Sequence, residues 1–147
     1  MRPIDSNSRR KHRHRGNELV EFALLLPALA MFLLAVGQGA EVMGTYQILC
    51  NAAREGARLS VVPGEFGNPN EIKARVVAYA AANGVTISAT AVTVNQGEIV
   101  NPGAGACSAT NACISASKVS VTYSYPISVL LGATINMGAA VEMRNFY

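Results

Sequence analysis

The chain has 147 residues, enough for one modest domain, and half of them are hydrophobic. Its net charge of +3 comes from the N-terminal tail, where six basic residues are opposed only by Asp5: Arg2, Arg9, Arg10, Lys11, Arg13 and Arg15. After Gly16 there are six Lys or Arg and eight Glu, a net charge of −2. Because the chain has no Trp and no basic face with aromatic partners, its composition argues against nucleic-acid binding.

An uninterrupted apolar run from Phe22 to Val36 follows the basic tail. Counted from Asn17, the segment has about twenty residues, enough to cross a hydrocarbon core about 30 Å thick. Basic residues directly before such a segment favour a cytoplasmic N-terminus. We therefore expect a basic cytoplasmic leader over residues 1–16, a transmembrane helix over 17–38, and an extracytoplasmic remainder. A cleaved signal peptide is the alternative, with Ala35-Val36-Gly37 as an acceptable cleavage site, but helical patterning continues past the membrane exit and favours retention.

Glu21 places a carboxylate at the edge of the apolar segment. Such a charge is costly in a membrane unless another group neutralises it. Together with the glycine five residues before it, Glu21 indicates a processing site and an assembly contact. The simpler interpretation is that its side chain only reaches the membrane interface. Pro27 removes one backbone donor and predicts a bend or a loosening of the helix.

Helical spacing continues through residues 39–62, where apolar and small residues recur at three- and four-residue steps. We expect an extracytoplasmic continuation of the helix that ends at Pro63-Gly64. One surface is predicted to be a helix-packing surface made of small residues: Ala52, Ala53, Gly56 and Ala57. Beside it, Arg54, Glu55 and Arg58 form a polar flank in which Glu55 and Arg58 can pair at i, i+3. This flank is either a solvated helix face or a contact with a partner or surface.

Residues 63–147 are expected to form a small α+β domain. A helix is predicted to start at Asn68-Pro69, with Glu71 three residues after the cap, and to close at Asn83-Gly84. Alternation predicts a strand over Val85–Val94, followed by a turn at Gln96-Gly97-Glu98.

Residues 101–111 read as a loop, after which alternation returns over Ile114–Tyr125. Pro126 is expected to stop that strand or to lie at a sheet edge, and Ala139–Met143 is the last predicted strand. The fold class is therefore α+β, with a long N-terminal membrane-spanning helix, a second short helix and three or four antiparallel strands.

Three cysteines, Cys50, Cys107 and Cys113, lie on the expected extracytoplasmic side, where disulfides are favoured. Cys107 and Cys113 enclose a short loop and are the expected pair. Cys50 is then either a small buried helical residue or an intermolecular contact. These thiols lack the further His or Cys ligands of a zinc site, so no metal is expected.

Residue types argue against an enzyme. The histidines, His12 and His14, lie in the basic tail with the only aspartate, Asp5. A Ser-His-Asp or Cys-His arrangement in the outer domain is thereby excluded. The glutamates are scattered and no phosphate-binding glycine loop is present, so we expect neither catalysis nor a cofactor.

The motif RGNELVEFALLLP at residues 15–27, followed by NAAREGAR at residues 51–58, resembles the TadE-like family. That family comprises minor pilins, or pseudopilins, of the tight adherence (Tad/Flp) pilus system. The ending at residues 139–144 is also similar, whereas residues 64–135 match loosely.

The resemblance implies a pilin-like fold and cleavage after Gly16 by a membrane prepilin peptidase, which makes Asn17 the new N-terminus. Glu21 then occupies the fifth mature position and Phe22 the sixth, where major Flp pilins would carry Tyr. The implied location is the inner membrane, single-pass, or the pilus itself. The implied partners are other pilins and pseudopilins of the Tad system, the prepilin peptidase, the inner-membrane assembly platform and the lipid bilayer. The alternative function is a membrane-anchored or secreted binding module whose apolar segment is only an anchor or a signal peptide.

Overall fold

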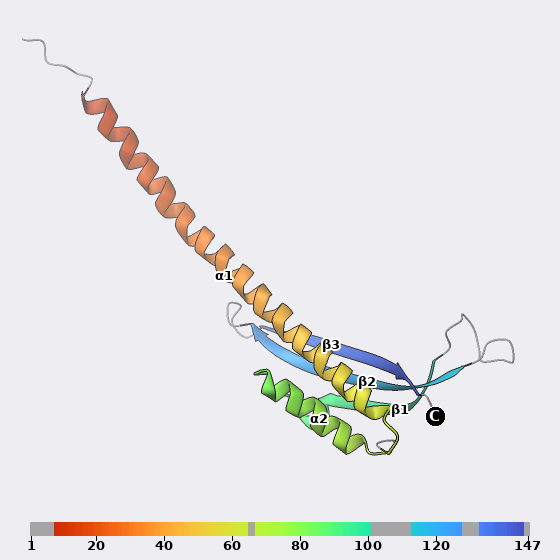
Figure 1. Cartoon of the computed structure of the whole chain (residues 1–147). Coiled ribbons are helices and arrows are strands. Elements are labelled where there is room, and N and C mark those ends of the chain that lie inside the picture. Colours follow the sequence, from red (N-terminus) through yellow and green to blue (C-terminus); the bar gives the residue numbers. More distant parts are fainter. Residues whose placement is uncertain (1–7, 65–66, 101–112, 128–132, 146–147) are drawn as a thin grey trace, which may run out of the picture. The chain divides into compact units, whose positions relative to one another are not determined.

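The computed structural model describes residues 8–64, 67–100, 113–127 and 133–145, with side chains from residue 18 onward. The chain divides into two compact units, residues 1–40 and 41–147 (Figure 1). The elements are the helix α1 (Ser8–Ser60), the helix α2 (Pro69–Ala82), the short 3-10 helix η1 (Ala89–Ala91), and the strands β1 (Val92–Val100), β2 (Ile114–Ile127) and β3 (Ala133–Arg144). The predicted α+β class, with a long N-terminal helix and a short second helix, is confirmed.

The three described strands form one antiparallel sheet in the order β1-β2-β3. β2 is the central strand and pairs with β3 from Ala116 to Ile127, but it pairs with β1 only as far as Val121. Beyond Val121, β2 therefore has a hydrogen-bonded neighbour on one side only. Pro126 lies in this half-paired end of β2, which agrees with the prediction of an edge position because proline cannot donate to a ladder.

The core of the second unit lies between the helices and the sheet. Its fully buried large side chains include Leu49 of α1, Ile72 and Val76 of α2, and Val119 and Val121 of β2. Burying such side chains stabilises the fold by about 1.5–3 kcal/mol each. The segment before β1 adds Val85 and Ile87 to the same cluster.

The C-terminus of α2 is closed as the Asn83-Gly84 pair predicts. Gly84 has φ +83°, and its N–H donates to the carbonyl of Ala81 at 3.0 Å. The N–H of Val85 donates to the carbonyl of Ala80 at 2.9 Å, and the two bonds together form a Schellman motif. At the other end, Asn68 is the N-cap and Pro69 occupies the first turn, as predicted, although the side chain of Asn68 makes no capping hydrogen bond.

The first strand begins later than predicted, at Val92 instead of Val85. Val85 and Ile87 are buried and Thr86 and Ser88 are exposed, so the alternating pattern correctly predicted which side chains face the core. It did not predict that this segment lacks a paired strand. The Ser88 side chain accepts a hydrogen bond from the N–H of Thr90 and starts η1 instead. The predicted turn at 96–98 is also wrong: those residues lie inside β1, at an irregularity between Asn95 and Glu98.

The last strand is longer than predicted and starts at Ala133 instead of Ala139. Residues 134–137 in its first part, Thr-Ile-Asn-Met, also alternate between polar and apolar side chains, but the predicted strand did not include them. They are paired with β2, in the ladder from Ile127↔Ala133 to Thr122↔Gly138. The strand therefore extends over this alternating segment as well.

β2 runs back along the part of α1 that belongs to the second unit. A Cβ added at Gly56 would lie 3.3 Å from Val119 Cγ1, and the Tyr125 hydroxyl donates to Glu41 Oε2 at 2.8 Å. The six strand steps from Val119 to Tyr125 cover about 20 Å, and the fifteen helical steps from Gly56 to Glu41 cover about 22 Å. The end of β2 therefore lies level with Glu41, where α1 enters this unit.

The Tyr125–Glu41 hydrogen bond should be measurable by titration. This bond raises the pKa of Tyr125 above its usual value of about 10. Since the raised pKa belongs to the folded state, the stabilising contribution is complete below pH 10 or so and is lost as the pH rises through the folded pKa. Tyrosinate difference absorbance of the folded chain should show a component that is delayed relative to free tyrosine and becomes smaller in Tyr125→Phe. The delay that remains comes from Tyr46, whose pKa is raised by its hydrogen bond with Cys50. An unchanged titration curve in Tyr125→Phe would contradict the assignment.

Candidate functional site

The residues predicted for processing and assembly lie in the first unit. Gly16 and Asn17 are part of α1, where only the backbone is described. Glu21 and Phe22 follow on the same helix and are exposed, Phe22 to 64%. Within the described part of the chain, Glu21 makes no hydrogen bond or ion pair. Its carboxylate is therefore accessible to a charged group from elsewhere.

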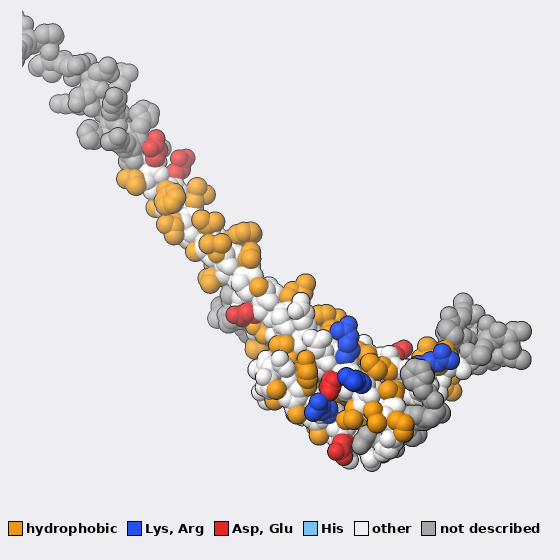
Figure 2. Space-filling view, viewed as in Figure 1, with side chains coloured by type: hydrophobic (Ala, Val, Ile, Leu, Met, Phe, Trp, Pro, Cys, Tyr) orange, Lys and Arg blue, Asp and Glu red, His pale blue; other side chains and the backbone are white. Residues whose placement is uncertain are grey.

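The apolar side chains after Glu21 are also exposed. Large hydrophobic residues from Leu19 to Val36 expose between 52% and 74% of their surface, and Figure 2 shows them along the helix. α1 continues through Pro27. Over the described residues, the stretch Glu18–Ser60 is the one helix long and apolar enough to cross a membrane. An apolar surface of this extent is compatible with membrane anchoring and is far larger than soluble monomers expose.

The small-residue surface of α1 lies in the second unit. Ala52, Ala53, Gly56 and Ala57 are buried, and a Cβ added at Gly56 would overlap Val76 Cγ2. The small side chains thus let α2 and β2 approach α1 closely within the same chain. They are not free for contact with another subunit.

The polar flank differs from the prediction in its pairing. Glu55 Oε1 lies 2.8 Å from Arg75 Nη2 of α2, not beside Arg58. Arg54 instead donates to Asn51 Oδ1 at 3.2 Å. Glu55 is half-buried toward α2 whereas Arg58 is exposed, so tertiary packing overrides the i, i+3 geometry. Figure 2 shows several basic side chains on this face of the second unit.

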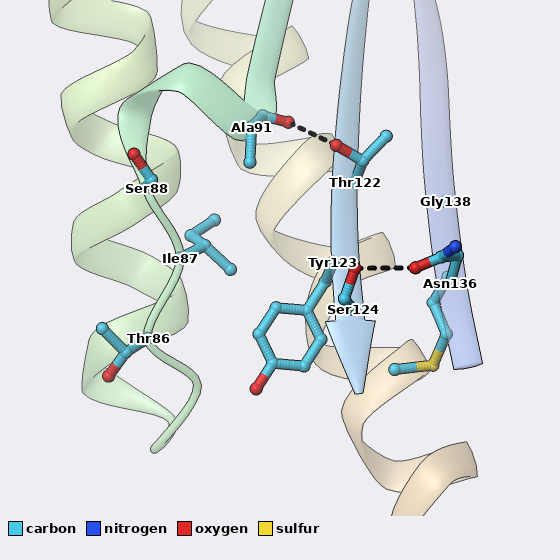
Figure 3. A pocket seen from close by; sticks show the side chains of 10 residues that line it. Thr86, Ile87, Ser88, Ala91, Thr122, Tyr123, Ser124, Asn136 and Gly138 are labelled. Carbon is cyan, nitrogen blue, oxygen red and sulfur yellow. Dashed lines mark hydrogen bonds between the residues drawn. The ribbon is translucent and has the colours of Figure 1, made fainter. Parts of the chain in front are cut away.

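The open cavities in the described part of the second unit include two with different linings. One, of about 730 Å³, lies between α1 and α2 and is lined by Glu55, Leu59, Asn70, Glu71, Ala74, Arg75 and Ala78. The other, of about 610 Å³, lies where the chain before β1 diverges from the half-paired end of β2, and its lining is uncharged (Figure 3). There Thr122 Oγ1 donates to the carbonyl of Ala91 at 3.3 Å, and Ser124 Oγ donates to Asn136 Oδ1 at 2.6 Å.

The cysteines differ in state. Cys50 is a free, half-buried thiol on α1, and Cys113 is disulfide-bonded. Cys107 lies outside the described residues, so the pair Cys107–Cys113 stays a prediction. Among the residues that the structure describes, no group of three or more His, Cys, Asp or Glu could hold a metal ion.

Non-reducing peptide mapping of the protein should test the predicted pair directly. We expect Cys107 and Cys113 in one cross-linked peptide, and Cys50 modified by an alkylating reagent once the chain is unfolded. Alkylation of Cys107 without prior reduction would contradict the pairing. A cross-link that includes Cys50 would do the same.

Two contacts that hold the second unit together were missed by sequence reasoning. Tyr125 and Glu41 lie 84 residues apart in the chain, and Glu55 and Arg75 lie 20 apart. Nothing in the local spacing of these residues marks them as partners. No sequence pattern predicted the uncharged cavity either, because the cavity forms where β1 does not continue along β2.

A comparison with protein families matches residues 16–58 to the family described as TadE-like protein. The match covers the exposed apolar segment, Glu21 and the buried small-residue surface, and confirms the resemblance predicted from the two motifs. No curated protein and no solved structure is significantly similar to the chain. A TadE-like segment indicates involvement in the Tad pilus system and association with other pilus components.

Proposed function

From the premise that residues 16–58 of this chain are TadE-like, we propose that the protein is a minor pilin or pseudopilin of the Tad/Flp pilus system. Residues 1–16 are its cytoplasmic leader, 17–38 its inner-membrane helix, 39–62 the continuation of that helix and 63–147 its extracytoplasmic domain. A prepilin peptidase removes the leader after Gly16. The mature protein acts by packing and recognition, without turnover, to initiate, cap or support the pilus.

The observation that carries this proposal is the placement of Glu21. It is an exposed carboxylate at the start of an exposed apolar helix, without a partner in the described part of its own chain. Cleavage after Gly16 would create an α-amine at Asn17, one helical turn away. A protonated amine from the same or a neighbouring chain would neutralise the carboxylate in apolar surroundings, and a pair between chains would select the register of assembly.

Two kinds of partner follow from this arrangement. The exposed apolar helix contacts lipid before assembly, and other pilins or pseudopilins of the Tad system afterwards. The leader and the first turn of the mature helix contact the prepilin peptidase, and the inner-membrane assembly platform receives the processed protein.

N-terminal sequencing of the protein isolated from cells that express the Tad system tests the proposal. We expect the mature chain to begin at Asn17. An intact Met1, or a start near Gln38, would overturn the processing and the pilin function with it.

A membrane-anchored or secreted binding module is the second candidate. Open cavities of the second unit favour it, since ligand sites are concave and have volumes of about 300–1,000 Å³. In that case the apolar segment is only an anchor or a signal peptide. The same sequencing experiment separates the two functions, because a start near Gln38 fits the binding module alone.

A further inference from the structure

One end of the second unit is almost without charge. Residues 76–97, from the second half of α2 into β1, contain no acidic or basic residue, and neither do residues 119–141, which include most of β2 and β3. The charged residues of the sheet lie toward its other end, where Lys118 Nζ is 2.7 Å from Glu142 Oε1. We call the half-paired part of β2 and the beginning of β3, residues 122–127 and 133–138, the hairpin end.

The hairpin end lies where α1 enters the second unit. Tyr125 hydrogen-bonds to Glu41, and β2 continues for two residues beyond Tyr125, to Ile127. Those two residues add about 7 Å of strand. The one acidic side chain described at this end, that of Glu41, is the acceptor for the Tyr125 hydroxyl.

Residue 41 also lies close to the proposed membrane exit. It is three residues beyond residue 38, a rise of about 4.5 Å along a helix. The polar headgroup layer occupies about 5–8 Å on each side of the hydrocarbon core. Chain connectivity therefore holds Glu41, and the Tyr125 hydroxyl that is bonded to it, within reach of the headgroup layer.

The side chains next to Glu41 and Tyr125 have the chemistry of an interface. Met43 of α1 is 65% exposed, and Ile135 of β3, which pairs with Tyr125, is 39% exposed. Tyr123 and Tyr125 are half-buried on β2. Tyrosine is enriched at membrane–water interfaces because its ring is apolar and its hydroxyl is polar. Apolar side chains beside it bury their surface among the lipid headgroups and the first acyl carbons.

We propose that the hairpin end is a second membrane contact, which rests in the headgroup layer of the bilayer that holds residues 17–38. The proposal rests on the membrane anchoring in the proposed function. Its occupant is a phospholipid surface, because the contact continues directly from the membrane-spanning segment. Since no basic residue lies at the hairpin end, the contact depends on apolar burial and neither on anionic lipid nor on salt.

The absence of Trp from the chain permits a direct test. Single tryptophans are introduced into the full chain as Ile135→Trp in the hairpin end, Ile99→Trp at the other end of the sheet, and Leu29→Trp in the apolar segment. Ile135 and Ile99 are both exposed isoleucines on strands, 39% and 69%, so they form a matched pair. Each variant is reconstituted into phosphatidylcholine vesicles, with and without lipid brominated near the carboxyl end of its acyl chains, and its folding is checked by circular dichroism.

We expect brominated lipid to quench the tryptophan fluorescence of Ile135→Trp and to leave that of Ile99→Trp unchanged. High salt should not alter either result. The emission of Ile135→Trp should also be shifted to shorter wavelength than that of Ile99→Trp. If Ile135→Trp does not fold, Thr134→Trp, at an exposed position beside it, replaces it.

Three outcomes would overturn the proposal, and they are distinguishable. Quenching of Leu29→Trp without quenching at position 135 leaves the anchoring intact and rejects the membrane contact. An unquenched Leu29→Trp rejects the anchoring itself, and with it the premise of the inference. A blue-shifted Ile135→Trp that is insensitive to brominated lipid and depends on the protein-to-lipid ratio identifies a second copy of the chain as the partner instead.

Discussion

Glu21→Gln should greatly reduce surface pili while the protein still inserts into the membrane. The substitution removes a charge but preserves shape, so the apolar helix remains competent for insertion. What it removes is the partner of the α-amine proposed at Asn17. An uncompensated charge deep in a membrane costs about 2.5–3.5 kcal/mol, and half of that is close to the ~1.4 kcal/mol that corresponds to a tenfold change. We therefore expect a roughly tenfold loss of pili, counted by electron microscopy, with unchanged amounts of protein in the membrane fraction.

Glu18→Gln is the matched control for this experiment. Glu18 is also an exposed carboxylate on the same helix, but it lies before the apolar run and only one residue after Asn17. It remains near water, so its charge needs no partner, and we expect near-normal pili. Normal piliation of Glu21→Gln would refute the charge role. An equal loss of pili in both variants would indicate that assembly requires negative charge in this helical turn, and not the Glu21 carboxylate in particular.

Gly56→Val should strongly destabilise the second unit. Even a single Cβ at this position would overlap Val76 Cγ2 and lie 3.3 Å from Val119 Cγ1. Val76 is stiff about its first side-chain torsion and cannot easily turn away. Overpacking of this kind costs about 1–3 kcal/mol or more, and about 1 kcal/mol lowers the melting temperature of a domain of 60–100 residues by about 4–8 °C. Thermal unfolding of the full chain in mild detergent, followed by circular dichroism, should show a decrease on the order of 10 °C.

Gly44→Val is the control, because a Cβ at Gly44 meets no atom within 4 Å. Both glycines lie inside α1, so the change in helix propensity is the same and only the packing differs. Gly56→Val combined with Val76→Ala should lose less stability than the sum of the two single variants, since the two residues share one space. Equal melting temperatures for the Gly56 and Gly44 variants would show that α2 does not pack against α1 at this point.

Several elements were predictable from local signals because their causes are local. The apolar run after Glu21 and the continuing helical spacing predicted the long helix, and Asn83-Gly84 predicted the end of α2. A left-handed residue after a helix and an apolar periodicity are properties of a few neighbouring residues. The two motifs that carry the TadE-like resemblance lie in the same continuous segment, so they too could be recognised before any fold was known.

Other elements were predicted wrongly because two different causes produce the same pattern. The alternation from Val85 to Ser88 reflects burial against the core, but no strand pairs with it. Glycine at position 97 is typical of a turn, yet β1 takes up Gly97 within an irregularity between Asn95 and Glu98. A local hydrogen bond between Ser88 and Thr90 decided the first case, and pairing of β1 with the distant strand β2 decided the second.

By itself, the sequence determined the membrane-compatible helix, the carboxylate beside its apolar run, the stripe of small residues and the TadE-like character of the segment 16–58. These properties depend on composition and on spacings of three or four residues, which are present in any conformation of the chain. Only the tertiary structure decided that Glu55 pairs with Arg75, that Tyr125 reaches Glu41, and that the hairpin end lies where α1 enters the unit. Those contacts join residues 20 and 84 positions apart, and they form only when packing of the core brings β2 back along α1.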